Sequence, residues 1–309
     1  PSGNFAPEIF SQKVLKFFRR ASVIEDITNT DYAGEIENFG DTVKIIKEPT
    51  VTVSSYQRGS VVNPQDLADD QISMVVDNAN AFAFKIDDIE ERHSHINFEA
   101  LATSSGAFAL KRKYDAAVLQ HISDAAGIAA SAVSGTTLTN TAAAGTLGTA
   151  NAPINVETDD NGINLMLAMA RLLDDQSVPE ENRWFVAPPI FYEGLGAAAS
   201  KVMDMSVIGS GQSPLTNGLV SDITISGMKL YKTTALNRSG TDIATISGTS
   251  NAFFCMGGHM SACATASHIA KTEVVRDPDS FSDVIRGLHV YGGKVLRPEA
   301  ITRTAVVLT

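Results

Sequence analysis

Charged residues are scarce in this chain of 309 residues, at 19% of the total, where about a quarter is usual for soluble proteins. Those present are mostly acidic: 24 Lys and Arg stand against 35 Asp and Glu, which gives a formal net charge of −11. A protein that binds nucleic acid by neutralising phosphates needs the opposite balance. The composition therefore argues against nucleic-acid recognition. It favours a surface buried between protein subunits, because neutral groups cost less than charges to remove from water.

Aromatic residues, cysteines and long apolar runs are also few. Aromatics make up 7%, which disfavours a packed all-β receptor module. Cys255 and Cys263 are too few for a disulfide framework, and we expect reduced thiols in a protein made in the cytoplasm. No apolar run approaches the roughly 18 residues of a membrane span, and residues 1–5 lack the basic-then-apolar order of a signal peptide. The sequence predicts a soluble chain with no membrane partner.

Sequence motifs for catalysis are missing. There is no Gly-x-Ser-x-Gly nucleophile turn and no His-Glu-x-x-His helix. The Gly-Gly-Lys segment at 292–294 resembles half of a phosphate-binding loop, but Leu288 stands where its first glycine should be. Val295 replaces the Ser or Thr that would reach magnesium. We expect this segment to form a turn between Val290 and Val295.

One cluster carries residue types that bind metals: Cys255, His259, Cys263 and His268. Its spacing, Cys-x3-His-x3-Cys-x4-His, does not match the Cys-x2-4-Cys pairs of structural zinc sites. The residues between these four are small and suit a tightly packed element, so packed thiols are favoured over zinc.

Pairs of adjacent aspartates are the remaining candidates for chemistry. Three of the four pairs flank expected helix ends, where capping explains them. A glycosidase needs two separated carboxylates in a cleft. The pairs are Asp69-Asp70, Asp87-Asp88, Asp159-Asp160 and Asp174-Asp175. We therefore predict no catalytic residue, no metal site and no cofactor.

An amphipathic helix is expected over residues 7–20, with Pro7 at its first position. Phe10, Val14 and Phe17 recur on one face of this helix. That face is too apolar for an isolated terminal helix. We expect these three side chains to be buried against another subunit or against the long helix described below, and we predict that they are inter-subunit contacts.

A long two-stranded excursion is expected near residues 41–84. Apolar residues alternate with polar ones along both arms, and a polar break separates the arms. A lone ribbon of this length is marginally stable in water and needs a surface to lie on. The alternating apolar residues are Val43, Ile45, Val51, Val53, Ile72, Met74 and Val76. We expect a neighbouring subunit to cover them, and we predict Tyr56, Arg58 and Gly59 at the tip as inter-subunit contacts.

The rest of the chain alternates between helix and strand. Apolar spacing predicts a long helix over 87–126, with small residues at 102–107 that would let another element cross closely and a bend near Gly106. A second helix is expected from about residue 158, followed by a buried strand at 184–186. A short strand is expected at 228–231, and mostly strands follow from residue 253.

Three stretches, taken with this order of elements, resemble one known family. They are FAPEIFS at 5–11 with YAGEI at 32–36 and GDTVKI at 40–45, VPEENRWFVAP at 178–188, and RDPDSF at 276–281 with GLHVYGGKV at 287–295. In this order they are similar to the Hong Kong 97-type capsid proteins, which form the shells of tailed phages and of encapsulin compartments. The resemblance covers essentially the whole chain.

The resemblance implies an α+β fold with five parts. An N-terminal arm is expected at 1–32 and an extended β-hairpin loop at 33–84. A spine helix of the peripheral domain is expected at 85–128 and an axial domain at 129–252. Strands that return to the peripheral domain, with the C-terminal strand, are expected at 253–309.

The resemblance also implies a function: a major capsid protein that assembles with itself into pentamers and hexamers around double-stranded DNA. Its expected partners are a scaffolding protein, a portal protein and a decoration or cement protein. Its expected location is the virion capsid, after assembly in the host cytoplasm. An encapsulin-like compartment shell is the alternative, because the same fold serves both. Since the arm begins at once in this sequence, we expect scaffolding to be separate or already cleaved away.

Overall fold

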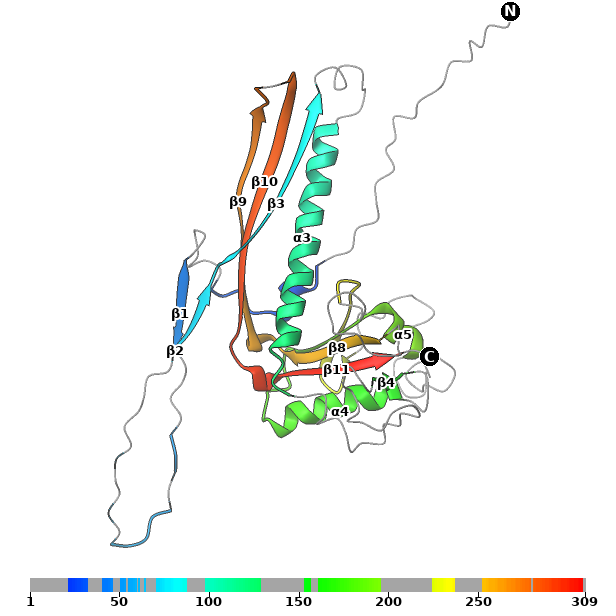
Figure 1. Cartoon of the computed structure of the whole chain (residues 1–309). Coiled ribbons are helices and arrows are strands. Elements are labelled where there is room, and N and C mark those ends of the chain that lie inside the picture. The colour runs from blue at the N-terminus through cyan, green and yellow to red at the C-terminus, as the bar shows by residue number, and fades with distance from the viewer. Residues whose placement is uncertain are drawn as a thin grey trace, which may run out of the picture.

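The computed structural model describes residues 22–32, 41–46, 51–53, 55–59, 61, 64, 71–87, 98–128, 153–156, 161–195, 224–236, 252–278 and 280–307. The helix expected at 7–20, with Phe10, Val14 and Phe17, lies outside these residues. An elongated lobe stands above a compact lobe, and a two-stranded ribbon projects to one side (Figure 1). No helix among the described residues is long and apolar enough to cross a membrane.

The elongated lobe consists of one long helix against a three-stranded sheet. Helix α3 (Phe98–Asp124) runs along strands β3 (Asn78–Asp87), β10 (Ser282–Val295) and β9 (Cys263–Arg276) (Figure 1). The sheet is antiparallel, with β10 in the centre. The long helix is confirmed, but it begins later than expected, because Asp87 is the last residue of β3.

The small residues of α3 admit a phenylalanine from the sheet. A Cβ atom on Gly106 would lie 2.9 Å from Cδ2 of Phe82, and one on Gly287 of β10 would lie 2.5 Å from Cε1 at the opposite edge of the same ring. The ring therefore occupies the space that two glycines leave open. The expected close crossing is confirmed, and Figure 1 shows α3 passing this point without a kink. Gly106 serves contact rather than bending.

The ribbon pairs β1 (Thr42–Ile46) with β2 (Gln71–Val75) in antiparallel register, Thr42 opposite Val75. It is shorter than the sequence pattern indicated, because residues 78–87 leave it and pair with β10. Alternation shows which residues share a face of a strand and does not identify the partner strand.

The base of the ribbon packs on its own subunit. Val43, Met74 and Val76 are buried, at 9%, 0% and 2% exposure, against Ala266 of β9 and Val290 of β10. The expectation that a neighbouring subunit covers every apolar residue of the ribbon is therefore wrong for these three.

Gly292, in the Gly-Gly-Lys segment at 292–294, explains how the ribbon base comes so close. The expected turn is wrong: the segment lies inside β10, with Gly292 opposite Ala266 and Gly293 opposite Thr265 of β9. A Cβ atom on Gly292 would lie 2.5 Å from the carbonyl oxygen of Val75. Glycine is present because another backbone crosses here.

The compact lobe is built on a six-stranded mixed sheet. Its order is β4 (Ile154–Asn155), β11 (Ile301–Val307), β8 (Ala252–His259), β5 (Arg183–Ala187), β7 (Met228–Lys232) and β6 (Thr224–Ile225). Helices α4 (Asn161–Asp175) and α5 (Pro189–Leu195) belong to this lobe. The expected helix, buried strand and short strand are confirmed.

The sheet of the compact lobe has a core on each face. Phe185 of β5 packs with α4 and Phe191 of α5 in the first core. Trp184 and Val186 of the same strand point into a second core, which also holds residues of α3, β10 and the short helix α1 (Ile24–Ile27). This second core, called here the junction core, joins the two lobes. Every residue of β5 is buried because both faces are covered.

Two chain crossings reinforce the junction core. Strand β8 passes through the 3-10 turn η4 (Met260–Ala262) into β9, and β10 passes through η5 (Pro298–Ala300) into β11. Each crossing links a strand of one sheet directly to a strand of the other. The lobes therefore share backbone as well as side-chain packing.

A buried arginine fixes the approach to β5. Arg183, at 2% exposure, donates from Nε to the carbonyl oxygen of Pro179 at 2.8 Å and from Nη2 to that of Val178. Its Nη2 also lies 2.7 Å from Oδ1 of Asp174 at the end of α4, which is half exposed. The guanidinium thus satisfies carbonyls of the loop that carries the chain from α4 to β5.

The substitution Gly106→Ala tests the contact between α3 and β3. In an open helix this change stabilises by about 1 kcal/mol. Here the new methyl group would meet the ring of Phe82, so we expect a net loss of about 1–2 kcal/mol in the free energy of unfolding, measured by urea denaturation. The matched control is the same change in a Phe82→Ala background, where it should stabilise. Stabilisation in both backgrounds would show that the ring does not limit the helix.

Candidate functional site

The cysteines and histidines of the described residues do not form a metal centre. No group of three potential metal-ligating residues occurs within the part of the chain that the structure describes. Cys255 lies in the core under α4, and Cys263 lies in the junction core. Burial raises the pKa of Cys255 well above its ordinary value and that of Cys263 to about 12. Both thiols are therefore protonated and packed, which confirms the favoured interpretation.

The exposed apolar residues gather in two places. Among the described residues, and apart from Leu167 on α4, the large apolar side chains that remain exposed lie on the ribbon or on the three-stranded sheet with its β9–β10 turn. Those on the ribbon are Ile46, Val51, Val53, Tyr56, Val61 and Val75; those on the sheet are Val274, Val275, Phe281 and Leu288. Exposed apolar groups gathered in this way mark surfaces for association.

The outer half of the ribbon carries the predicted tip contacts. Tyr56, Arg58 and Gly59 are all exposed there, and Val53 is 96% exposed. Gly59 has a φ of 91°, a backbone conformation that favours glycine, although a Cβ atom there would meet nothing within 4 Å. The three predicted residues are thus adjacent and available for contact, and the assignment of their partner remains a prediction.

Beyond the part where the ribbon base packs on Ala266 and Val290, one face of the three-stranded sheet is uncovered by any described element. Phe82 points toward α3, so Ala81 and Ala83 on either side point away from it, and both are exposed. Leu288 of β10 is directly opposite Ala81 and shares this open face. Small and apolar side chains let another backbone approach closely.

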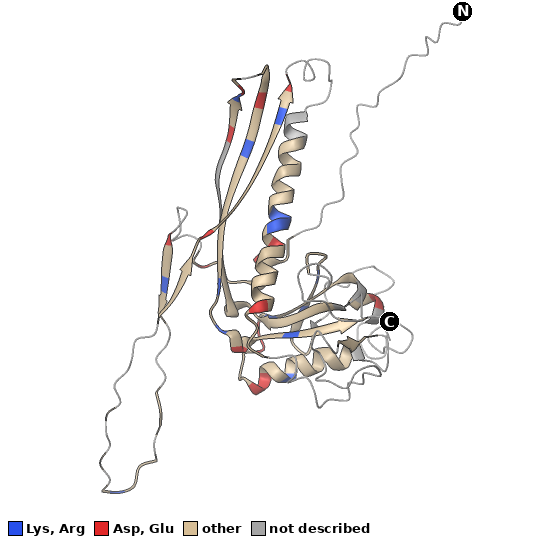
Figure 2. Ribbon diagram, in the orientation of Figure 1, with Lys and Arg blue, Asp and Glu red and all other residues tan. Residues whose placement is uncertain are grey.

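Charges at the outer end of this sheet are paired. Figure 2 shows both signs there, close together. Nζ of Lys85 lies 2.6 Å from Oδ2 of Asp277, and Nη1 of Arg276 lies 3.1 Å from Oδ1 of Asp283. Further along, Nε of Arg286 lies 2.7 Å from Oε1 of Glu273. Each pair cancels its own charge, and Asp87 at the end of β3 adds a further acidic group to this end of the sheet.

The described end of the arm is docked on the spine helix. Ile24 and Ile27 of α1 are fully buried in the junction core. Oγ of Ser22 donates to Oδ1 of Asp115 on α3 at 2.5 Å. Burial raises the pKa of Asp115 above its ordinary value. Residues 22–27 are therefore fixed against α3 and the junction core.

Phe281 belongs to the RDPDSF segment that resembles the capsid family, and the sequence did not predict that its ring would be exposed. The available signal was its context, since a phenylalanine follows the turn-forming residues Asp277, Pro278, Asp279 and Ser280. A large apolar residue in such a turn is exposed by default.

Comparisons with known proteins agree with this geometry. The profile of a family described as phage capsid protein matches residues 49–304. A chain from Mycobacterium phage Che8 is similar, with a TM-score of 0.75, 26% identity and coverage of 97% of both chains. A chain of the cyanophage P-SCSP1u capsid has a TM-score of 0.69 at 18% identity and covers 99% of this chain and 94% of its own. No curated protein matches the sequence.

The mature capsid of bacteriophage PhiM1 contains a further similar chain, with a TM-score of 0.66 and 17% identity, covering 98% of this chain and 91% of that one. At these identities the P-SCSP1u and PhiM1 structures support the fold alone. The family profile spans most of the sequence, from the ribbon to the last strand. The chain belongs to the phage capsid protein family, and its fold is the Hong Kong 97-like fold that the sequence resemblance implied.

Proposed function

We propose that this chain is the major capsid protein of a tailed bacteriophage, a non-enzymatic subunit that assembles into the pentamers and hexamers of an icosahedral head. The observation that carries the proposal is the ribbon, whose base is fixed to its own subunit while its outer half stays apolar and uncovered. A lone ribbon of this kind gains stability only when another surface covers it. In a shell the neighbouring subunit supplies that surface.

The charge of the chain fits a container for double-stranded DNA. With a net charge of −11, the subunit repels phosphates overall, so packaged DNA would be enclosed without being bound tightly. Tight binding along a shell wall would oppose packaging and release. The acidic composition thus supports DNA as non-specific content.

We also propose the remaining partners and the division into parts that the family resemblance implies. We assign residues 1–32 to the arm, 33–84 to the extended loop, 85–128 to the spine, 129–252 to the axial domain and 253–309 to the returning strands. Residues 78–84, at the end of the proposed loop, belong to β3 and pair with β10. A scaffolding protein, a portal protein and a decoration protein complete the expected set of partners. Assembly in the host cytoplasm would precede location in the virion capsid.

Hydrogen exchange tests the role of the ribbon. Residues 51–61 lack cover in the isolated subunit, so their amides should exchange fast in free subunits and slowly in shells. Residues 42–46 and 71–75 are paired and packed on their own subunit, and they should be slower than 51–61 in free subunits. Trypsin should cut after Arg58 in free subunits and much less in shells. Equal exchange of residues 51–61 in both states would exclude a neighbour as the cover.

Deletion of residues 57–68 separates folding from assembly. The deleted segment lies beyond β1 and β2, so the shortened subunit should keep its circular dichroism spectrum and its unfolding midpoint. Shell yield, measured by sedimentation and electron microscopy, should fall sharply. Normal shells from this variant would mean that the ribbon tip is not an assembly contact.

The arm is tested by the double variant Phe10→Ala, Phe17→Ala. If both rings are buried in a contact, each truncation costs about 3 kcal/mol, and the heat resistance of shells should drop. Gln12→Ala is the control, because Gln12 lies off the apolar face of the same expected helix. Wild-type yield and heat resistance in the double variant would contradict the predicted docking of the arm.

A further inference from the structure

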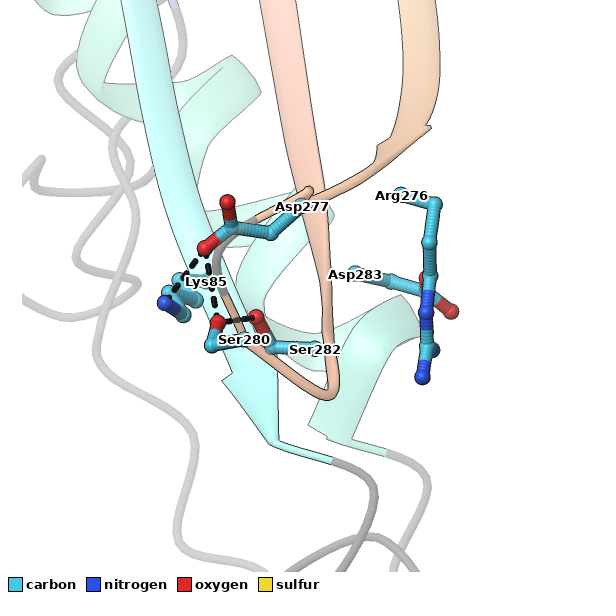
Figure 3. Close-up of polar contacts among 6 residues, drawn as sticks. All are labelled: Lys85, Arg276, Asp277, Ser280, Ser282 and Asp283. Atoms are coloured by element: carbon cyan, nitrogen blue, oxygen red, sulfur yellow. Dashed lines mark hydrogen bonds and ion pairs between the residues drawn. The ribbon is translucent and has the colours of Figure 1, made fainter.

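The turn between β9 and β10 is held by a network of polar contacts (Figure 3). Nζ of Lys85 on β3 and Oγ of Ser280 both donate to Oδ2 of Asp277, at 2.6 and 2.7 Å. The hydroxyl groups of Ser280 and Ser282 lie 2.7 Å apart. The amide of Asp277 donates to the carbonyl oxygen of Ser282 at 3.0 Å, and that of Ser282 donates to Ser280 at 2.9 Å. The turn is therefore fixed from both strands and from β3.

Phe281 projects from this fixed turn. Its side chain is 80% exposed, although the next residue, Ser282, is fully buried. The ring contributes little to the stability of its own subunit, because most of its apolar surface stays in water. A polar residue would suit such a position better in a protein that remains a monomer.

The network already holds the turn in an ordered conformation, so little further ordering is needed when the ring meets a partner. Ordering a loop when it binds consumes part of the binding free energy, and a preordered loop avoids that loss. An exposed aromatic ring on a rigid support, with polar groups around it, has the features of a residue that dominates an interface. The turn thus has the features of one side of a protein–protein interface.

The charges around Phe281 indicate which partner supplies the other side of this interface. The ion pairs Arg276–Asp283 and Lys85–Asp277 lie on either side of the turn that carries the ring (Figure 3), and each pair is partly exposed. Two copies of a chain with net charge −11 repel each other over most of their surface. They repel least where the charges are neutralised in pairs. A surface with alternating signs can also match a copy of itself, since each cation can meet the partner copy's anion.

We propose that Phe281 is an anchor through which the β9–β10 turn contacts a second copy of this chain, and that the Lys85–Asp277–Ser280–Ser282 network positions it. This inference rests on the proposed function, since the second copy is a neighbour in the shell. It adds a contact outside the ribbon and the arm. Asp277 acts here as a positioning residue, because it holds the turn that carries the ring.

A photo-crosslinker at residue 281 tests the contact directly. Phe281 is replaced with p-benzoylphenylalanine, which keeps the ring, and particles are irradiated after assembly, with the scaffolding protein coexpressed if assembly needs it. We expect covalent dimers of this chain, with residue 281 joined to a peptide of another copy in mass spectra. Adducts within one chain, adducts to another protein alone, or no adducts would overturn the proposal.

Substitutions at residue 281 then measure how much the ring contributes to shell assembly. Phe281→Ser should lower shell yield at limiting subunit concentration by at least about tenfold, whereas Phe281→Leu should retain most of it. Leu167→Ser is the matched control: it removes an exposed apolar side chain from α4 in the other lobe and should have a much smaller effect. Circular dichroism and the unfolding midpoint should be unchanged in all three. Equal yields from Phe281→Ser and wild type would overturn the proposal.

The positioning role is tested by a double-mutant cycle. Asp277→Ala should lower shell yield in the wild-type background and have little further effect in Phe281→Ser, because the ring it positions is already absent. Independent effects in the two backgrounds would contradict positioning. The two proposals also fail separately. A wild-type chain that never forms shells contradicts the proposed function, whereas normal wild-type shells with an indifferent residue 281 contradict this inference alone.

Discussion

Both lobes of the subunit depend on the junction core. Trp184 and Val186 of the compact lobe, Ile122 of the spine helix and Tyr291 of the elongated sheet all pack there. The strands that enter this core leave it as strands of the other sheet, through η4 and η5. Neither lobe can rotate against the other without disrupting buried side chains and two backbone crossings. The two lobes therefore form one rigid body to which the ribbon is attached.

Rigidity of the body gives meaning to what is left uncovered. Arg183 satisfies the carbonyl oxygens of the loop after α4, and Phe82 fills the space left by two glycines between α3 and the sheet. These polar and apolar contacts of the interior are made within one chain. The exposed apolar groups lie almost entirely at the extremities. A subunit of a closed shell requires this division between an interior packed within one chain and apolar groups that stay exposed until neighbours cover them.

Local patterns in the sequence predicted most of the elements, because helix and strand periodicity reflect which face of an element is buried. The helix at Asn161–Asp175 and the buried strand at Arg183–Ala187 follow from such patterns. Strand partners were not predictable in the same way. Residues 78–87 alternate like the ribbon, yet they pair with a strand about 200 residues later. Gly292 was misread because glycine marks both turns and close backbone approaches, and only the position of Val75 distinguishes the two. The exposed ring of Phe281 became meaningful only when the hydrogen bonds beneath it were known.

The glycine at 292 also determines where the ribbon can change direction. Strand β10 and the chain at Val75 are in contact over a distance that admits no side chain, so the root of the ribbon cannot slide or tilt on the sheet. Any pivot must lie further out than this root, which the paired strands β1 and β2 extend as far as Ile46 and Gln71. A subunit that meets neighbours at different angles, as in five-fold and six-fold rings, would then adjust only the part of the ribbon beyond its packed base. The differences in angle between neighbouring subunits would be accommodated in this outer part of the ribbon, and the two lobes would keep the same structure in every position.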